Sequence, residues 1–173
     1  ESMLPTLYNN ESLFEYKLCY YFRQPARGEI VIFEYDTGKY ESKWMPFDKE
    51  QVNYVKRVIA LPGETIDIRD GKVYINGKLL IEPYLAEGTM TTVPSSSFDL
   101  EAQVQYPYTV PEGQYFVMGD NRPESKDSRY IGAVSKSRIR GKVEFVMLPV
   151  DAIRSVVHTQ PYFEGEENPN EAE

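Results

Sequence analysis

Two turn dipeptides only six residues apart constrain the fold of this chain more than any other feature of its sequence. Asp70-Gly71 and Asn76-Gly77 separate three short runs rich in β-branched and other apolar residues. Asp, Asn and Gly tolerate the positive φ angles that two-residue hairpin turns require. The pattern therefore predicts three antiparallel strands joined as a meander. These strands are expected at residues 65–69, 72–75 and 78–81.

Short runs of β-branched and aromatic residues recur along the rest of the chain. Residues 82–111 instead contain Ser95-Ser96-Ser97 with scattered Pro and Thr, and they are predicted to form a cap or small insertion. We therefore expect an all-β fold, built on antiparallel sheets with very little helix. The further predicted strands are residues 29–35, 54–61, 115–118 and 141–148, with a short helical turn at residues 135–139.

The charges are distributed unevenly, and their pattern predicts one domain followed by a tail. The 173 residues have a net charge of -8, and five of the 27 acidic residues lie at positions 164–173, where there is no Lys or Arg. Residues 1–163 are therefore the expected domain, and residues 164–173 an acidic tail without fixed structure. Charge is nearly balanced within residues 1–163, which argues against nucleic-acid binding, because that needs a basic surface.

The scarcity of cysteine and histidine excludes folds that are stabilised by disulfides or by a structural zinc ion. One cysteine, Cys19, cannot form an intramolecular disulfide, and with one histidine, His158, it leaves too few ligands for a structural zinc site. We therefore expect neither a metal nor a cofactor. No apolar run within residues 1–173 approaches the roughly 18–20 residues that span a bilayer.

Ser2 and Lys56 are the first candidates for chemistry. Ser2 begins the segment SMLPTL, in which Pro5 restricts the backbone, although a serine in such a place is also an ordinary capping or solvated residue. Lys56 interrupts an otherwise apolar strand in YVKRVIALPGE, residues 54–64. A lysine buried there loses its proton more easily and becomes a general base, whereas a lysine on the outer face of a strand is only solvated.

A third segment, MGDNRPESKDSRYIG at residues 118–132, concentrates polar and charged side chains after a predicted strand. Gly119-Asp120-Asn121 indicates a turn. A turn does not require the polar and charged residues that follow it. Their side chains can pair with one another or orient a neighbouring side chain. The alternative is a charged surface loop held by its own ion pairs. The residues concerned are Arg122, Ser125, Asp127, Ser128 and Arg129.

Together with RGEIVIF at residues 27–33, these three segments resemble bacterial type I signal peptidases, which are membrane-anchored serine proteases with a Ser/Lys dyad. The four segments occur in the order found in that family. The resemblance implies that Ser2 is the nucleophile and Lys56 the general base. It also implies supporting residues, namely Ser125 to orient the lysine, Asp127 with Arg129 to structure the platform, and Asp120 and Arg122 at further structural positions.

The sequence departs from the family pattern at two places. Ala60 and Glu64 stand in IALPGE where the family usually has Gly and Asp, and both changes lie away from the expected dyad. In some members an oxyanion-hole donor lies two residues before the nucleophile, at a position that residues 1–173 do not include. The donor that the sequence offers is the backbone N–H of Ser2.

The resemblance further implies a substrate, a membrane partner and a location. Members of the family cleave secretory preproteins after a small-x-small pattern such as Ala-x-Ala, bound in an extended conformation. The catalytic domain, of the compact kind typical of Gram-positive members, is expected outside the cytoplasm, anchored in membrane lipid by a span that precedes residue 1. The expected substrate-binding residues are Met3, Leu7, Tyr54 and Val55, which line S1, and Val31, which contributes to S3.

Other interpretations of the same residues remain open. A Ser-His-Asp triad needs a histidine, but His158 lies outside all four segments, and Cys19 has no histidine partner in any of them. A self-cleaving repressor-type Ser/Lys protease shares the dyad and lacks the last segment. A non-catalytic β-domain would bind peptides or glycans through the 14 tyrosines. The aromatic run LCYYF at residues 18–22 is either core or a contact with a membrane interface.

Overall fold

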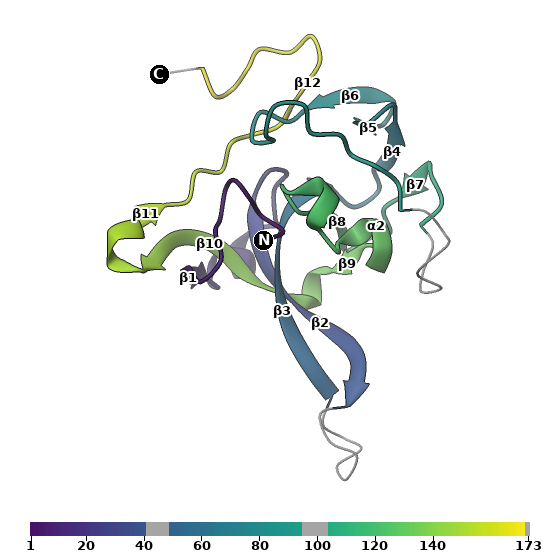
Figure 1. Cartoon of the computed structure of the whole chain (residues 1–173). Coiled ribbons are helices and arrows are strands. Elements are labelled where there is room, and N and C mark those ends of the chain that lie inside the picture. The colour runs from purple at the N-terminus through teal and green to yellow at the C-terminus, as the bar shows by residue number, and fades with distance from the viewer. Residues whose placement is uncertain (41–48, 95–103, 172–173) are drawn as a thin grey trace.

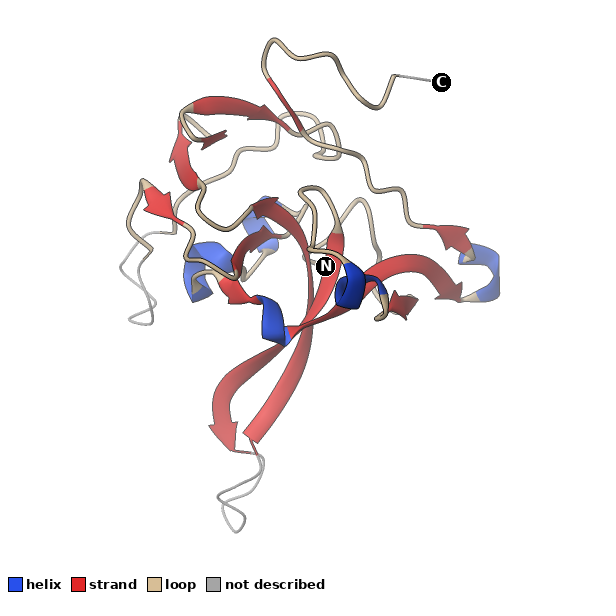
Figure 2. Ribbon diagram, turned by 180° about the vertical axis from the view of Figure 1, so that it is seen from behind, coloured by secondary structure: helices blue, strands red, loops and turns tan. Residues whose placement is uncertain are grey.

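The computed structural model describes residues 1–40, 49–94 and 104–171. Its strands form two antiparallel sheets, one of seven strands and one of five. The two α-helices, α1 (Cys19–Phe22) and α2 (Ser128–Ile131), have four residues each, and Figure 2 shows how little of the described chain is helical. The predicted all-β class is therefore confirmed. None of these helices has the length and apolar character needed to cross a bilayer.

The seven-stranded sheet has the order β1-β10-β2-β3-β8-β9, with β11 paired to β10. Its strands are β1 (Ser12–Tyr16), β2 (Ile30–Tyr40), β3 (Lys49–Ala60), β8 (Gln114–Met118), β9 (Val134–Ser135), β10 (Ile139–Leu148) and β11 (Arg154–Ser155). Three 3-10 turns lie between elements, at Arg122–Glu124, Lys136–Arg138 and Val150–Ala152. The second of these confirms the helical turn predicted at residues 135–139.

The five-stranded sheet has the order β12-β6-β5-β4-β7 and is built mainly from the predicted meander. Both residues of each turn dipeptide have positive φ, between 51° and 81°, as the two-residue hairpin requires. The strand bounds agree with the prediction because these dipeptides fix where each strand ends. The strands are β4 (Thr65–Arg69), β5 (Lys72–Ile75), β6 (Lys78–Ile81), β7 (Tyr108–Thr109) and β12 (Tyr162–Phe163).

Residues 82–111 form an excursion that begins after β6 and includes β7. Positions 95–103 of this excursion lie outside the described residues. The excursion supplies β7 to the five-stranded sheet, and the other four strands of that sheet come from the meander and β12. Part of the excursion is also buried, since Tyr84 and Thr91 are 8% and 2% exposed. Tyr84 packs in one core cluster with Ile66 of β4 and Phe116 of β8, so the excursion contacts both sheets.

The long hairpin of β2 and β3 carries Lys56 into the centre of the seven-stranded sheet. Val31 pairs with Lys56 and Ile30 with Arg57. On the other side of β3, the pairing with β8 begins at Arg57, opposite Met118. No described strand pairs with residues 52–56 on that side, so β3 has an open edge that ends at Lys56. In Figure 1 this part of the hairpin extends away from the body of the molecule.

The segment that carries Ser2 has no regular secondary structure, and apolar burial holds it in place. Met3 and Leu7 pack with Ile30, Val143 and Val156 in one core cluster, and both are at most 5% exposed. Burying two side chains of this size contributes about 3–6 kcal/mol to the segment's attachment. A backbone hydrogen bond from Leu7 N to Met3 O, at 2.9 Å, closes the segment on itself.

Candidate active site

Ser2 and Lys56 meet in the structure although 54 positions separate them. Lys56 Nζ lies 2.6 Å from Ser2 Oγ, in hydrogen-bond contact, and it also donates to the carbonyl of Val55 at 3.0 Å. The core cluster around Met3 fixes the serine, and the pairing of β3 with β2 fixes the lysine. A nucleophile and a base within hydrogen-bond reach form the arrangement that nucleophilic catalysis needs.

The surroundings of Lys56 favour its neutral form. The residue is 4% exposed, and this burial lowers the pKa of its amine from 10.5 to about 8, because a low-dielectric environment disfavours the charged form. The charge of Arg129 acts in the same direction, while Asp127 and Asp120 oppose it. A lysine with this pKa can accept a proton near neutral pH, so it is not a solvated residue on an outer face.

A turn from the third segment packs directly behind Ser2. Asn121 N donates to Ser2 O at 3.1 Å, and Asn121 Nδ2 donates to Glu1 O at 3.2 Å. A Cβ atom on Gly119 would lie closer than any real contact allows to both Ser2 O and Ser125 Oγ. Glycine is therefore required here because the turn and the nucleophile segment approach so closely.

Asp127 organises the platform on which this turn rests. Its carboxylate is fully buried and accepts from Gly119 N at 3.0 Å and from Arg129 Nε at 2.9 Å. It also caps α2 by accepting from Arg129 N. Ser128 Oγ in turn accepts from Val117 N at 2.9 Å, which joins α2 to β8. The segment is a buried hydrogen-bonded platform rather than a charged surface loop.

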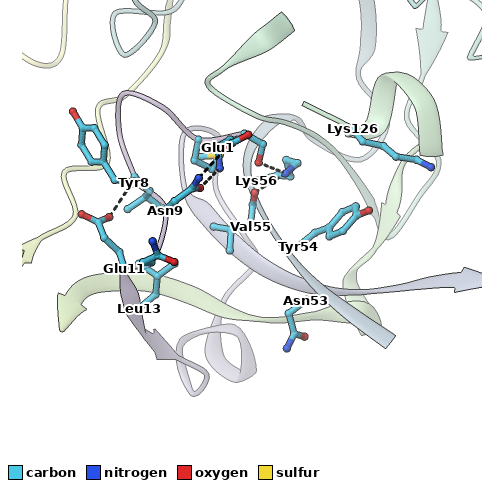
Figure 3. A pocket seen from close by; sticks show the side chains of 14 residues that line it. Glu1, Tyr8, Asn9, Glu11, Leu13, Asn53, Tyr54, Val55, Lys56 and Lys126 are labelled. Atoms are coloured by element: carbon cyan, nitrogen blue, oxygen red, sulfur yellow. Dashed lines mark hydrogen bonds between the residues drawn. The ribbon is translucent and has the colours of Figure 1, made fainter. Parts of the chain in front are cut away.

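A groove of about 460 Å³ opens beside the dyad (Figure 3). The open edge of β3 forms one wall, and residues of the nucleophile segment and β1 form the other. The ring of Tyr54 in the first wall is fixed by Tyr35, which stacks on it at a centroid distance of 5.1 Å. The lining residues are Glu1, Ser2, Met3, Leu7, Tyr8, Asn9, Asn10, Glu11, Leu13, Asn53, Tyr54, Val55, Lys56 and Lys126.

Comparison with known proteins identifies the family to which this fold and site belong. The family described as signal peptidase, peptidase S26, matches residues 1–148. The chain belongs to the signal peptidase family. Membership makes it a serine peptidase, and of the functions that the sequence left open, this is the one that the family match supports.

Two Bacillus proteins agree with this membership. A signal peptidase I of Bacillus licheniformis is 41% identical over 155 residues, which are 88% of this chain and 75% of the relative. Signal peptidase I T of Bacillus subtilis (strain 168) is 39% identical, over 88% of this chain and 72% of that protein. A crystal structure of a signal peptidase I from Enterococcus faecalis V583 has 36% identity and a TM-score of 0.47, covering 69% of this chain and 97% of that chain.

Four of the five expected pocket residues line the groove of this family member, and one does not. Met3, Leu7, Tyr54 and Val55 are all part of its lining. Val31 is fully buried in a core cluster. Val31 lies on the same face of the β2–β3 hairpin as Lys56, with which it pairs. Its expected contribution to an S3 pocket stays a prediction.

The side-chain contacts of Ser125 differ from those that the family resemblance implied. Its Oγ is buried and has no hydrogen-bond partner among the described residues, so the expected hydrogen bond to Lys56 is not formed. The amine of Lys56 is instead directed toward Ser2 Oγ and the Val55 carbonyl. Ser125 contributes to the platform through its backbone, since its carbonyl accepts from Arg129 Nη2 at 3.3 Å.

Arg57 is a buried residue of the site that the sequence interpretation missed. It is fully buried and makes two hydrogen bonds to Asp120, Nε to Oδ1 at 2.9 Å and Nη2 to Oδ2 at 2.7 Å. Its guanidinium also stacks over the ring of Tyr84 at 3.9 Å. The available signal was a second charged residue beside Lys56 in an apolar strand, which could not be assigned to a buried partner from the sequence alone.

Arg122 ties the excursion after β6 to the turn behind Ser2. Its Nε donates to Gly119 O at 3.1 Å, and its Nη2 donates to Glu82 Oε1 at 2.5 Å. It also hydrogen-bonds to Thr91. Arg122 thus makes contacts of a structural kind, and Glu82 and Thr91 are partners that the sequence did not predict.

His158 and Cys19 lie away from the groove and have structural partners. His158 Nδ1 accepts from Ile30 N at 3.3 Å, and its Nε2 is 2.8 Å from Val143 O. Burial lowers the pKa of the imidazole. Cys19 is buried, with its thiol 3.1 Å from Tyr16 O. Neither residue contacts Ser2, so the dyad needs no histidine or cysteine.

Proposed function

We propose that this serine peptidase removes signal peptides from secretory preproteins, with Ser2 as nucleophile and Lys56 as general base. The observation that carries the proposal is the 2.6 Å contact between Lys56 Nζ and Ser2 Oγ at the groove. The relatives named signal peptidase I support the substrate class. Residues 1–163 act as the catalytic domain, and residues 164–173 as a tail outside it.

The reaction proceeds through an acyl-enzyme. Neutral Lys56 accepts the proton of the Ser2 hydroxyl while Oγ attacks the scissile carbonyl, and the oxyanion that forms is stabilised by the Ser2 backbone N–H. The Lys56 ammonium then returns the proton to the leaving amine as the peptide bond breaks. Lys56 next takes a proton from water, the hydroxide attacks the ester, and Ser2 is released with its proton restored. The supporting residues are Ser125, Asp127, Arg129, Asp120 and Arg122.

The open edge of β3 suits an extended substrate. Residues 53–55 border the groove and have no described strand partner on that side. A peptide can therefore add its backbone to this edge, which places alternate side chains against the groove wall. Met3, Leu7, Tyr54 and Val55 supply an apolar surface beside the dyad, and we propose that it selects small side chains in an Ala-x-Ala pattern.

An acylating serine-protease inhibitor tests the nucleophile directly. We expect one covalent adduct on the chain, located at Ser2 by peptide mass mapping, and none on Ser2→Ala. Ser137→Ala, which changes an exposed serine outside the groove, should label like the parent. Labelling that persists in Ser2→Ala would rule out the nucleophile, and a chain that shortens when incubated alone would favour the self-cleaving alternative.

We further propose that the domain works at a membrane surface on the extracytoplasmic side, with membrane lipid as a partner. In α1 and the residue before it, Leu18, Tyr21 and Phe22 are 58%, 82% and 87% exposed. Lys17 and Arg23 flank this run. Exposed aromatic side chains between cations are typical of segments that lie in the headgroup region of an anionic bilayer. Cys19 and Tyr20 are buried, so residues 18–22 are part core and part surface.

Binding to vesicles tests the membrane surface. We expect the chain to sediment with vesicles that contain anionic lipid, and the double variant Tyr21→Ser/Phe22→Ser to bind at least about fivefold more weakly, because it removes apolar area from the contact. Val93→Ser, which changes an exposed apolar side chain in another loop, is the matched control. Equal binding by the parent and the double variant would contradict the proposal for this surface.

A further inference from the structure

The nucleophile segment is tied at both of its ends to the same turn. Ser2 O accepts from Asn121 N at 3.1 Å, and four residues later Thr6 Oγ1 donates to Asp120 Oδ2 at 2.5 Å. The segment has no helix or strand of its own. Its position relative to Lys56 therefore depends on such tertiary contacts together with the burial of Met3 and Leu7.

Asp120, which accepts the Thr6 hydrogen bond, is itself immobilised. Its carboxylate makes two hydrogen bonds to Arg57, and both side chains are fully buried. Arg57 directly follows Lys56 on β3, and its Nη2 also reaches Thr6 Oγ1 at 3.5 Å. The hydroxyl of Thr6 thus joins the nucleophile segment to an ion pair whose arginine neighbours the base.

The backbone of Thr6 is held from a second direction. Its carbonyl accepts from Arg154 Nη2 at 3.1 Å, and Arg154 makes a two-point ion pair with Glu11, at 2.6 Å and 3.1 Å. The residue is therefore fixed both through its side chain and through its backbone. The hydroxyl contact of Thr6 can be removed by a substitution that keeps the shape of the side chain.

We propose that Thr6 is a positioning residue for the nucleophile, acting through the hydrogen bond from its hydroxyl to Asp120. This inference rests on the proposed roles of Ser2 and Lys56. Thr6 lies outside the groove lining and does not contact the reacting atoms. Its hydroxyl acts by keeping Ser2 Oγ within reach of the Lys56 amine.

The same hydrogen bond has an electrostatic consequence. The charged groups that act on the Lys56 amine are Asp127, Asp120 and Arg129, and Arg57 is bonded to Asp120. The Thr6 hydroxyl offsets part of the negative charge of Asp120. Without the hydroxyl, Asp120 stabilises the ammonium form of Lys56 more strongly, so the pKa of Lys56 rises and the enzyme needs a higher pH to supply the neutral base.

The test compares Thr6→Val, which keeps the shape and loses the hydroxyl, with Thr6→Ser, which keeps the hydroxyl. With an Ala-x-Ala peptide we expect Thr6→Val to lower kcat about 10- to 100-fold with KM within about twofold of the parent, because misplacement of the nucleophile affects the chemical step. The acidic limb of its pH profile should move to higher pH. Thr6→Ser should recover most of the lost kcat.

Thr109→Val is the matched control, because Thr109 Oγ1 makes an exposed hydrogen bond to Thr65 Oγ1 in the five-stranded sheet, away from the dyad. It should leave kcat and the pH profile unchanged. A Thr6→Val enzyme with parental kcat overturns the proposal, and so does one whose loss is shared equally by Thr6→Ser or is explained by unfolding in a melting curve. If instead Ser2→Ala keeps full activity, it is the proposed dyad that fails.

Discussion

Peptide cleavage should fall by about 10²- to 10⁴-fold when Lys56 is replaced by methionine, since this is the usual contribution of a general base. Methionine has a similar length and apolar character, so the groove keeps its shape while the amine that contacts Ser2 Oγ is lost. The measurement is kcat/KM for an Ala-x-Ala peptide in the presence of detergent or lipid. A variant that retains parental activity would exclude Lys56 as the base.

The pH profile of the parent enzyme reports the ionisation of the Lys56 amine. Burial lowers the pKa of Lys56 to about 8, and only the neutral amine accepts the serine proton. The value of kcat/KM should therefore rise as pH increases through about 8 and level off above it. A rate that is flat between pH 6 and 10 would contradict this assignment.

The free energy of unfolding of Lys56→Met distinguishes a variant that lacks the general base from one that has unfolded. Below pH 8 the amine is charged in both the folded and the unfolded chain, so folding carries the full cost of burying that charge. The cost disappears as pH rises through the folded pKa of about 8 toward the ordinary value of 10.5. Lys56→Met removes the cost at pH 7. The variant should therefore be more stable than the parent by roughly 1–3 kcal/mol, and its inactivity could not be attributed to unfolding.

Local turn chemistry accounts for the part of the fold that the sequence predicts best. The bounds of β4, β5 and β6 follow from Asp70-Gly71 and Asn76-Gly77, whose positive φ angles are decided within the dipeptides. The strands β7, β9, β11 and β12 have two residues each, too few to show a period. These strands form because the rest of the fold places a partner strand beside each of them. No local sequence pattern indicates this pairing.

In the candidate site as well, the sequence predicts residues with a local signal and misses contacts between residues that are distant in the sequence. Ser2 and Lys56 were recognisable by residue type and by the segments around them, and the structure brings them together. The partner of Arg57 was not recognisable, because Asp120 lies 63 positions away. Ser125 is assigned through the resemblance, and its side-chain contacts depend on a rotamer, which the sequence segments do not specify.

The buried ion pair of Arg57 and Asp120 should be the most sensitive structural element near the dyad. Replacing Asp120 by asparagine keeps the shape of the side chain and leaves the arginine without its counter-charge. Both side chains are fully buried, and removing one partner of such a pair costs about 3–5 kcal/mol. We expect a loss of this size in the free energy of unfolding, measured by urea denaturation, together with lower activity because Thr6 and the turn behind Ser2 lose their anchor.

Two further variants determine whether burial of the pair causes this effect. Asp67→Asn removes the partner of Arg69 in a solvent-exposed pair of the five-stranded sheet, and it should cost less than about 1 kcal/mol. The double variant Arg57→Met/Asp120→Leu removes both charges, so it should be more stable than Asp120→Asn, because no uncompensated charge is left in the interior. If Asp120→Asn were no more destabilising than Asp67→Asn, the ion pair would not hold the turn in place. Recovered stability in the double variant without recovered activity would mean that the pair serves to position Ser2 rather than to stabilise the fold.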